Sequence, residues 1–159
     1  MKERLQAALD LRYKNNEKSN EMLVELVKKF PTDSVINYQC AWSFDLLSNE
    51  VAAIPLYEKA IMLGLKADAL ADALVGLGSS YRSIGKYDKA LLTFETAIEK
   101  FPTNLVFQTF KSMTLYNLND SKQAVEELLK ILVKSTNDEH IKKYSKALLN
   151  YAADLNKIG

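Results

Sequence analysis

The stretch from Leu74 to Pro102 constrains the fold of this chain more than any other segment. Large and small residues recur there at helical spacing on both sides of a turn at Ile84-Gly85-Lys86. They are Leu74, Leu77, Gly78 and Tyr81 before the turn, and Tyr87, Ala90, Phe94 and Ala97 after it. Two such patterns joined by a short turn predict two antiparallel helices in close contact. The basic element of the chain is therefore a helix pair.

The same pattern returns along the chain at a period near 34 residues. Ala90 and Ala124 are 34 positions apart, whereas Ala60 and Ala97 are 37 apart. The three additional residues are expected around Gly64, because glycine suits the left-handed end of a helix. A period of this length indicates a repeat protein, in which neighbouring helix pairs stack and bury a continuous core.

Two helices in about 34 residues resemble the tetratricopeptide repeat (TPR) family. Unit 71–104 contains every class of signature residue and closes with Pro102. The chain is similar to a small, bacterial-type, stand-alone TPR domain. This resemblance implies an all-α fold, an α-solenoid in the form of a right-handed superhelix, with about four helix pairs and a C-terminal capping helix. One domain is expected over 1–159, with repeats at about 1–33, 34–70, 71–104 and 105–138 and the cap at 139–157.

Turn and cap residues divide the chain into nine predicted helices. Their ranges are 2–14, 18–29, 33–47, 50–63, 68–84, 87–100, 104–118, 121–135 and 138–157. Asn and Asp side chains at the breaks can accept hydrogen bonds from the first free N–H groups of a helix. The expected N-caps are Asp33, Asn49, Asn104, Asp120 and either Asn137 or Asp138.

Composition argues against several classes of partner. The net charge is +1 and hydrophobic residues make up 48% of the chain, which gives no electrostatic reason to expect nucleic acid or a membrane surface as partner. No apolar run is long enough to span a membrane, and the amphipathic N-terminus does not resemble a signal peptide. The single Cys40 excludes an intramolecular disulfide. A cytoplasmic protein is the simplest prediction.

The sequence offers no set of residues for catalysis. His140 is the only histidine, so a multi-histidine metal site is excluded, and it is expected to be solvated. Cys40 lies at a small-residue packing position and is predicted to be a buried structural thiol. Gly76-Leu77-Gly78 lies inside a helix and lacks the context of a phosphate-binding loop. No enzyme activity, metal or cofactor is expected.

In the TPR family the first helix of each pair lines a concave groove that binds peptides or helices. Counting along the first helix of each unit gives the residues expected to face this groove. The candidates are Tyr38, Gln39, Trp42, Ser79, Arg82, Phe110, Met113 and Tyr116. Tyr, Trp and Arg are the residue types that carry most binding energy in protein interfaces.

A second interpretation of these residues stays open, because aromatic residues at helical spacing more often lie in the core. Trp42, Phe110 and Met113 either line the groove or pack against the next repeat or under the C-terminal helix. Tyr38, Arg82 and Tyr116 are expected to be exposed.

Three functions follow from the resemblance. The leading hypothesis is a non-enzymatic module that binds a peptide or helix of a partner protein in the groove. The second is a self-associating structural or scaffold protein, which would form homo-oligomers. The third is a regulatory TPR protein that responds to a short signalling peptide, with Arg82 and Asp45 positioning the peptide termini. The carboxylate clamp of chaperone-binding TPR proteins is not expected, because Ala8 stands where that clamp has Asn.

Overall fold

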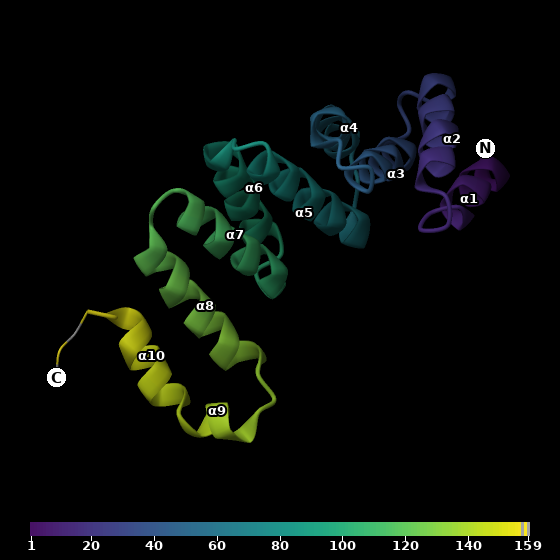
Figure 1. The fold of residues 1–159 in the computed structure, drawn as a ribbon. Coiled ribbons are helices and arrows are strands. Elements are labelled where there is room, and N and C mark those ends of the chain that lie inside the picture. Colours follow the sequence, from purple (N-terminus) through teal and green to yellow (C-terminus); the bar gives the residue numbers. More distant parts are fainter. Residues whose placement is uncertain (157, 159) are drawn as a thin grey trace. The chain divides into compact units, whose positions relative to one another are not determined.

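A computed structural model of the protein describes residues 1–156 and 158, and this part of the chain forms helices and turns without a β-strand (Figure 1). The first five helices are α1 (Lys2–Asp10), α2 (Asn16–Lys29), α3 (Ser34–Asp45), α4 (Glu50–Met62) and α5 (Ala67–Ser83). The next five are α6 (Tyr87–Lys100), α7 (Leu105–Asn117), α8 (Ser121–Ser135), α9 (Glu139–Lys143) and α10 (Ser145–Ala153).

The helices gather into two compact units, Met1–Lys89 and Ala90–Gly159, which we call the N-terminal and C-terminal units. In the N-terminal unit each helix from α1 to α4 packs against the next one along the chain. Helix α3 also packs against α5, as expected for equivalent helices of successive pairs. In the C-terminal unit α8 packs against both α7 and α10. The predicted repeat boundaries, and the single domain over 1–159, stay predictions.

The predicted N-caps are confirmed by hydrogen bonds from backbone N–H groups to their side chains. Five capping side chains accept a backbone N–H of the helix that they begin: Asp33, Asn49, Asn104, Asp120 and Asp138. Such caps satisfy donors that have no partner inside the helix. Gly64 has a φ of 92°, which confirms the predicted left-handed residue after α4. The caps and turns therefore act as the sequence indicated.

The C-terminal helix predicted over 138–157 is wrong as a single element. The chain forms α9 and then α10, with a break at Tyr144, where φ is −100° and ψ is 8°. Helix α9 buries no residue, whereas α10 lies alongside α8 and buries Ala152 completely (Figure 1). The break lets the chain turn back and place α10 on α8. Lys157, at the end of the predicted helix, lies outside the described residues.

The first helix is also shorter than predicted, because α1 ends at Asp10 rather than at residue 14. A turn follows, in which Tyr13 has a φ of 67° and its backbone N–H donates to Asn16 Oδ1 at 2.8 Å. This turn brings Arg12 beside α3, where its guanidinium donates to the carbonyl oxygen of Gln39 at 3.2 Å.

Each unit has its own apolar core. In the N-terminal unit, side chains of α1, α2 and α3 form one cluster of buried residues, Ala8, Leu23, Leu26, Ile36 and Cys40. Burial raises the pKa of the Cys40 thiol to about 12, so the thiol stays protonated, and the predicted buried structural role of Cys40 is confirmed. In the C-terminal unit, Phe94 and Phe107 are the largest fully buried side chains.

Candidate functional site

Two candidate groove residues of the N-terminal unit, Tyr38 and Trp42, belong to a row of aromatic side chains. The Arg12 guanidinium lies 4.2 Å from the centre of the Trp42 ring. The centres of the Trp42 and Tyr38 rings are 6.0 Å apart, and those of the Tyr38 and Tyr57 rings are 6.4 Å apart. Cation–π and tilted aromatic contacts at these distances are attractive. The row therefore joins the turn after α1 to α3 and α4.

The expectation that Tyr38 is exposed is wrong, because only 4% of its surface is accessible. Its ring lies between Trp42 and Tyr57, and its hydroxyl donates to Asp72 Oδ2 at 3.4 Å. Burial raises the pKa of Tyr38 to about 12, so the phenol stays neutral. Side chains of α3, α4 and α5, namely Trp42, Tyr57 and Asp72, lie around Tyr38.

The ring of Tyr57 reaches α5 at Gly76. A Cβ atom added to Gly76 would lie 2.4 Å from Tyr57 Cζ, so a larger residue requires the ring to move. Gly76 is therefore a packing residue, because it leaves room for the end of Tyr57. A glycine inside the helix predicted over 68–84 is the signal in the sequence that a side chain from another helix enters there.

Asp45 accepts two hydrogen bonds at the end of α3. Tyr57 donates to its Oδ2 atom at 2.6 Å, and Ser80 donates to its Oδ1 atom at 2.9 Å. Burial raises the pKa of this carboxyl above its ordinary value, and the two donors oppose that shift. Both oxygen atoms of Asp45 thus accept hydrogen bonds within the protein. The carboxylate is therefore already engaged and does not serve to position a peptide terminus, as the regulatory hypothesis required.

The other polar candidates of the N-terminal unit are partly buried. Ser79 donates to the Gly76 carbonyl at 3.1 Å, inside its own helix. Gln39 and Arg82 are half-buried, which for Arg82 is less exposure than expected. The Oε1 atom of Gln39 is buried and accepts no hydrogen bond from the described residues.

The three candidates of the C-terminal unit lie on α7 and differ in exposure. Phe110 is half-buried, with its ring 5.6 Å from that of Phe94 on α6. Met113 is 38% exposed and Tyr116 is 66% exposed. The expected exposure of Tyr116 is confirmed, and Met113 belongs to the surface. Because residues three apart share one side of a helix, Met113 and Tyr116 form an apolar and aromatic face on α7.

A salt bridge holds α7 against its neighbour in this unit. Lys111 Nζ lies 3.5 Å from Glu95 Oε1, so α7 is linked to α6 by this ion pair and by the contact between Phe94 and Phe110. The face with Met113 and Tyr116 therefore belongs to a helix that is fixed within its own unit.

Within residues 1–156 and 158, no three or more His, Cys, Asp or Glu side chains are grouped so that they could hold a metal ion. Every helix in that part of the chain is too short or too polar to serve as a membrane span. His140 is exposed in the first turn of α9, as expected.

Successive, antiparallel helix pairs of this kind define an α-solenoid. The family model described as tetratrico peptide repeat matches residues 34–155, from the start of α3 to just beyond α10. The chain belongs to the tetratricopeptide repeat family, and it has the all-α solenoid fold expected from its repeats. Proteins of this family are modules for protein–protein interaction.

Solved structures agree with this fold. The crystal structure of MamA protein has a TM-score of 0.73 at 20% identity, and the match covers 98% of this chain and 78% of that one. A chain of the APC/C hetero-tetramer Cut9–Hcn1 also has a TM-score of 0.73, at 18% identity. That match covers 95% of this chain but only 29% of the other. A search of curated protein sequences gave no match.

Proposed function

We propose that this protein is a non-enzymatic binding module that holds a peptide or helix of a partner protein against the exposed face of α7. The observation that carries the proposal is the exposure of Met113 and Tyr116, one turn apart on the same side of α7. In the N-terminal unit, by contrast, the side chains of Trp42 and Tyr38 are in contact with Arg12 and Tyr57.

The chemistry of this face favours a partner helix with apolar residues one or two turns apart. Such a helix would place its apolar side on Met113 and Tyr116, as in other helix-in-groove complexes. Tyrosine is enriched among the residues that dominate interface energetics, because it combines a large apolar ring with a polar hydroxyl. The fold relative in the Cut9–Hcn1 assembly is also part of a protein complex. A cytoplasmic location is part of this proposal.

Replacing Tyr116 with alanine is expected to weaken partner binding by at least about tenfold, because a central aromatic contact is lost. A partner would first be identified by co-purification and mass spectrometry, and its affinity then measured by isothermal titration calorimetry. Met113→Ala should weaken binding less. Tyr151→Ala removes an equally exposed tyrosine on α10 and should leave the affinity unchanged. Equal affinities for the Tyr116 and Tyr151 variants would contradict the proposed site.

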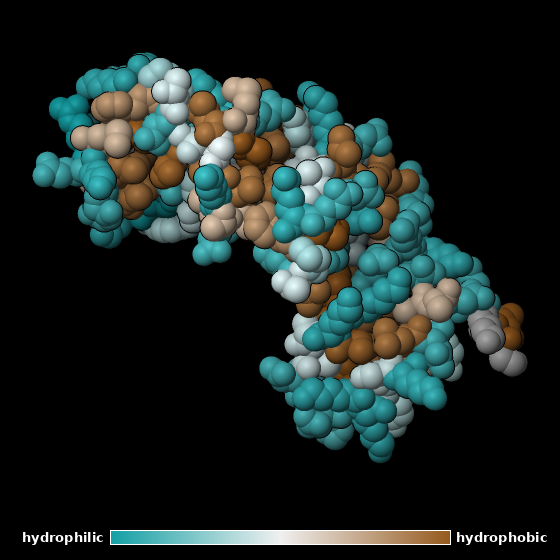
Figure 2. All heavy atoms as spheres, turned by 180° about the vertical axis from the view of Figure 1, so that it is seen from behind, coloured by the Kyte–Doolittle hydropathy of each residue, from teal (hydrophilic) through white to brown (hydrophobic). Residues whose placement is uncertain are grey.

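Self-association is a second candidate function, and exposed apolar residues on α8 favour it. Val125, Leu128 and Leu132 are exposed at spacings of three and four residues, which places them on one side of the helix. Leu149 of α10 is exposed as well. Figure 2 shows apolar side chains in brown between teal ones in the part of the molecule that contains α8 and α10.

If this stripe on α8 joins two copies, sedimentation velocity should show a dimer population that grows with protein concentration. The double variant Leu128→Gln and Leu132→Gln should then remain monomeric, because it places polar groups in the interface. The same changes should leave the affinity for an α7 partner unaltered. A wild-type protein that stays monomeric over the whole concentration range would rule out this second function.

A further inference from the structure

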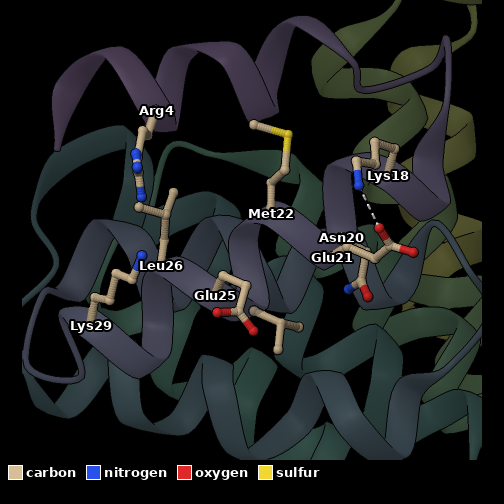
Figure 3. Close-up of a pocket in the computed structure, with 9 residues that line it drawn as sticks. Arg4, Lys18, Asn20, Glu21, Met22, Glu25, Leu26 and Lys29 are labelled. Carbon is tan, nitrogen blue, oxygen red and sulfur yellow. Dashed lines mark hydrogen bonds and ion pairs between the residues drawn. The ribbon is translucent and has the colours of Figure 1, made fainter.

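A cavity of about 610 Å³ lies in the N-terminal unit, apart from the face of α7. Arg4 of α1 lines it together with side chains of α2, among them Lys18, Glu21, Met22, Leu26 and Lys29 (Figure 3). The volume of this cavity lies in the range typical of ligand sites, about 300–1,000 Å³.

The acidic side chains of the cavity already have basic partners. Glu21 pairs with Lys18 at 2.9 Å. Glu25, which also lines the cavity, pairs with Lys28 at 2.7 Å, and Lys28 is not part of the lining. The hydrogen bond from Lys28 is the main cause of the lowered pKa of Glu25, and the charge of Lys29 adds a smaller effect. The charges of Glu21 and Glu25 are therefore compensated mainly by Lys18 and Lys28.

Arg4 and Lys29 are the basic groups of the cavity that form no ion pair with the described residues. In Figure 3 the side chain of Arg4 extends from α1 toward Leu26, and that of Lys29 extends toward Leu26 from the opposite side. Two like charges directed at one place repel each other, and a carboxylate between them would be favoured by both. This end of the cavity is therefore suited to an anion.

The surface next to these two basic groups is apolar. Leu26 is buried in the core, and its side chain forms the wall between Arg4 and Lys29. Met22 lies one turn earlier on α2 and extends into the same cavity (Figure 3). Methionine adapts its shape to apolar groups of different size. A ligand for this cavity would thus carry a carboxylate with an apolar group beside it.

We propose that the cavity binds an acidic and apolar segment of a partner protein, with an Asp or Glu carboxylate between Arg4 and Lys29. An apolar side chain of the same segment lies on Met22, beside the edge of Leu26. A helix presents an acidic and an apolar residue on one side when they are three or four positions apart, which is also the spacing from Met22 to Leu26 and from Leu26 to Lys29 on α2. This second binding site lies in the other unit from α7, and it does not depend on the proposed function of Met113 and Tyr116.

The test uses an acetylated and amidated, alanine-rich peptide that carries leucine and glutamate one helical turn apart. Its twin has glutamine in place of glutamate. Titration into the full-length, ¹⁵N-labelled protein should shift the amide resonances of α1 and α2, including those of Met22 and Lys29. The glutamine twin should bind at least about tenfold more weakly. The affinity of the glutamate peptide should also fall as ionic strength rises from about 0.01 to 0.1 M, because salt screens exposed charges.

Two double variants separate the cavity from general surface charge. Arg4→Gln with Lys29→Gln should weaken the glutamate peptide about tenfold. Lys2→Gln with Lys14→Gln makes the same change of charge in the same unit, outside the cavity lining and away from the ion pairs of Glu21 and Glu25, and should change the affinity less than about twofold. Equal binding of the two peptides, equal loss in the two double variants, or shifts centred on α7 would each overturn the proposal.

Discussion

Replacing Phe94 with alanine is expected to lower the free energy of unfolding by about 3–5 kcal/mol. Phe94 has no accessible surface, and its ring packs 5.6 Å from that of Phe110. Removing the ring loses its transfer free energy and leaves a cavity between α6 and α7 that the two helices can only partly close. A domain of this kind has a total stability of about 5–15 kcal/mol, so the change removes a large part of it.

Chemical denaturation followed by circular dichroism would measure this loss. Leu92→Ala is a suitable control, because Leu92 lies on the same helix, is also changed to alanine and is 65% exposed. Its effect should stay below about 1 kcal/mol. A Phe94 variant as stable as the Leu92 variant would show that the core of the C-terminal unit does not depend on this ring.

Changing Tyr57 to phenylalanine should cost about 1.5–3 kcal/mol near neutral pH, because it removes a hydrogen bond to a charged, partly buried acceptor. The Tyr57 hydroxyl donates to Asp45 Oδ2 at 2.6 Å, and only Ser80 would remain as a donor to that carboxylate. The ring itself is kept, so its packing over Gly76 is preserved. Thermal or urea unfolding at several pH values would measure the effect.

The cost of this change should depend on pH in a defined direction. The folded-state pKa of Asp45 is raised by burial, and the bond from Tyr57 lowers it, so Tyr57→Phe should raise the pKa further. Below the unfolded pKa of Asp, about 3.9, the carboxyl is neutral in both states and the cost should be small. As the pH rises through the folded pKa of Asp45, the variant should lose stability relative to wild type.

Tyr38→Phe provides the matched comparison for this prediction. Its hydroxyl makes a longer bond of 3.4 Å to Asp72, which is exposed, so its removal should cost less than about 1 kcal/mol. An NMR titration of the Asp45 carboxyl should show a higher pKa in the Tyr57 variant and no change in the Tyr38 variant. A pKa that is unchanged in both variants would contradict the assigned role of Tyr57.

The helices and their pairing could be predicted from the sequence because they depend on residues close together in the chain. Asp33 and Asn49 accept hydrogen bonds from residues three positions later, and Gly64 takes a left-handed conformation by itself. The spacing of Ala90, Phe94 and Ala97 likewise predicts which side of α6 is buried, and all three are. Repetition at about 34 residues then identifies the family.

Exposure of the candidate site residues could not be predicted in the same way. Tyr38 was a candidate for the groove surface, yet it is buried and its ring lies against those of Tyr57 and Trp42. Tyr116 was a candidate for the same groove, and it is exposed on α7. The difference in exposure arises from the size of side chains on other helices. Counting positions along one helix gives no information about those side chains.

The spacing of apolar, small and capping residues alone was enough to predict the all-α solenoid and to place eight of its helices, because each of these features acts over a few positions of the chain. The tertiary structure decided the break at Tyr144, the burial of Tyr38 and the cavity beside Arg4. Each of these depends on how side chains far apart in sequence fill or leave the space between packed helices.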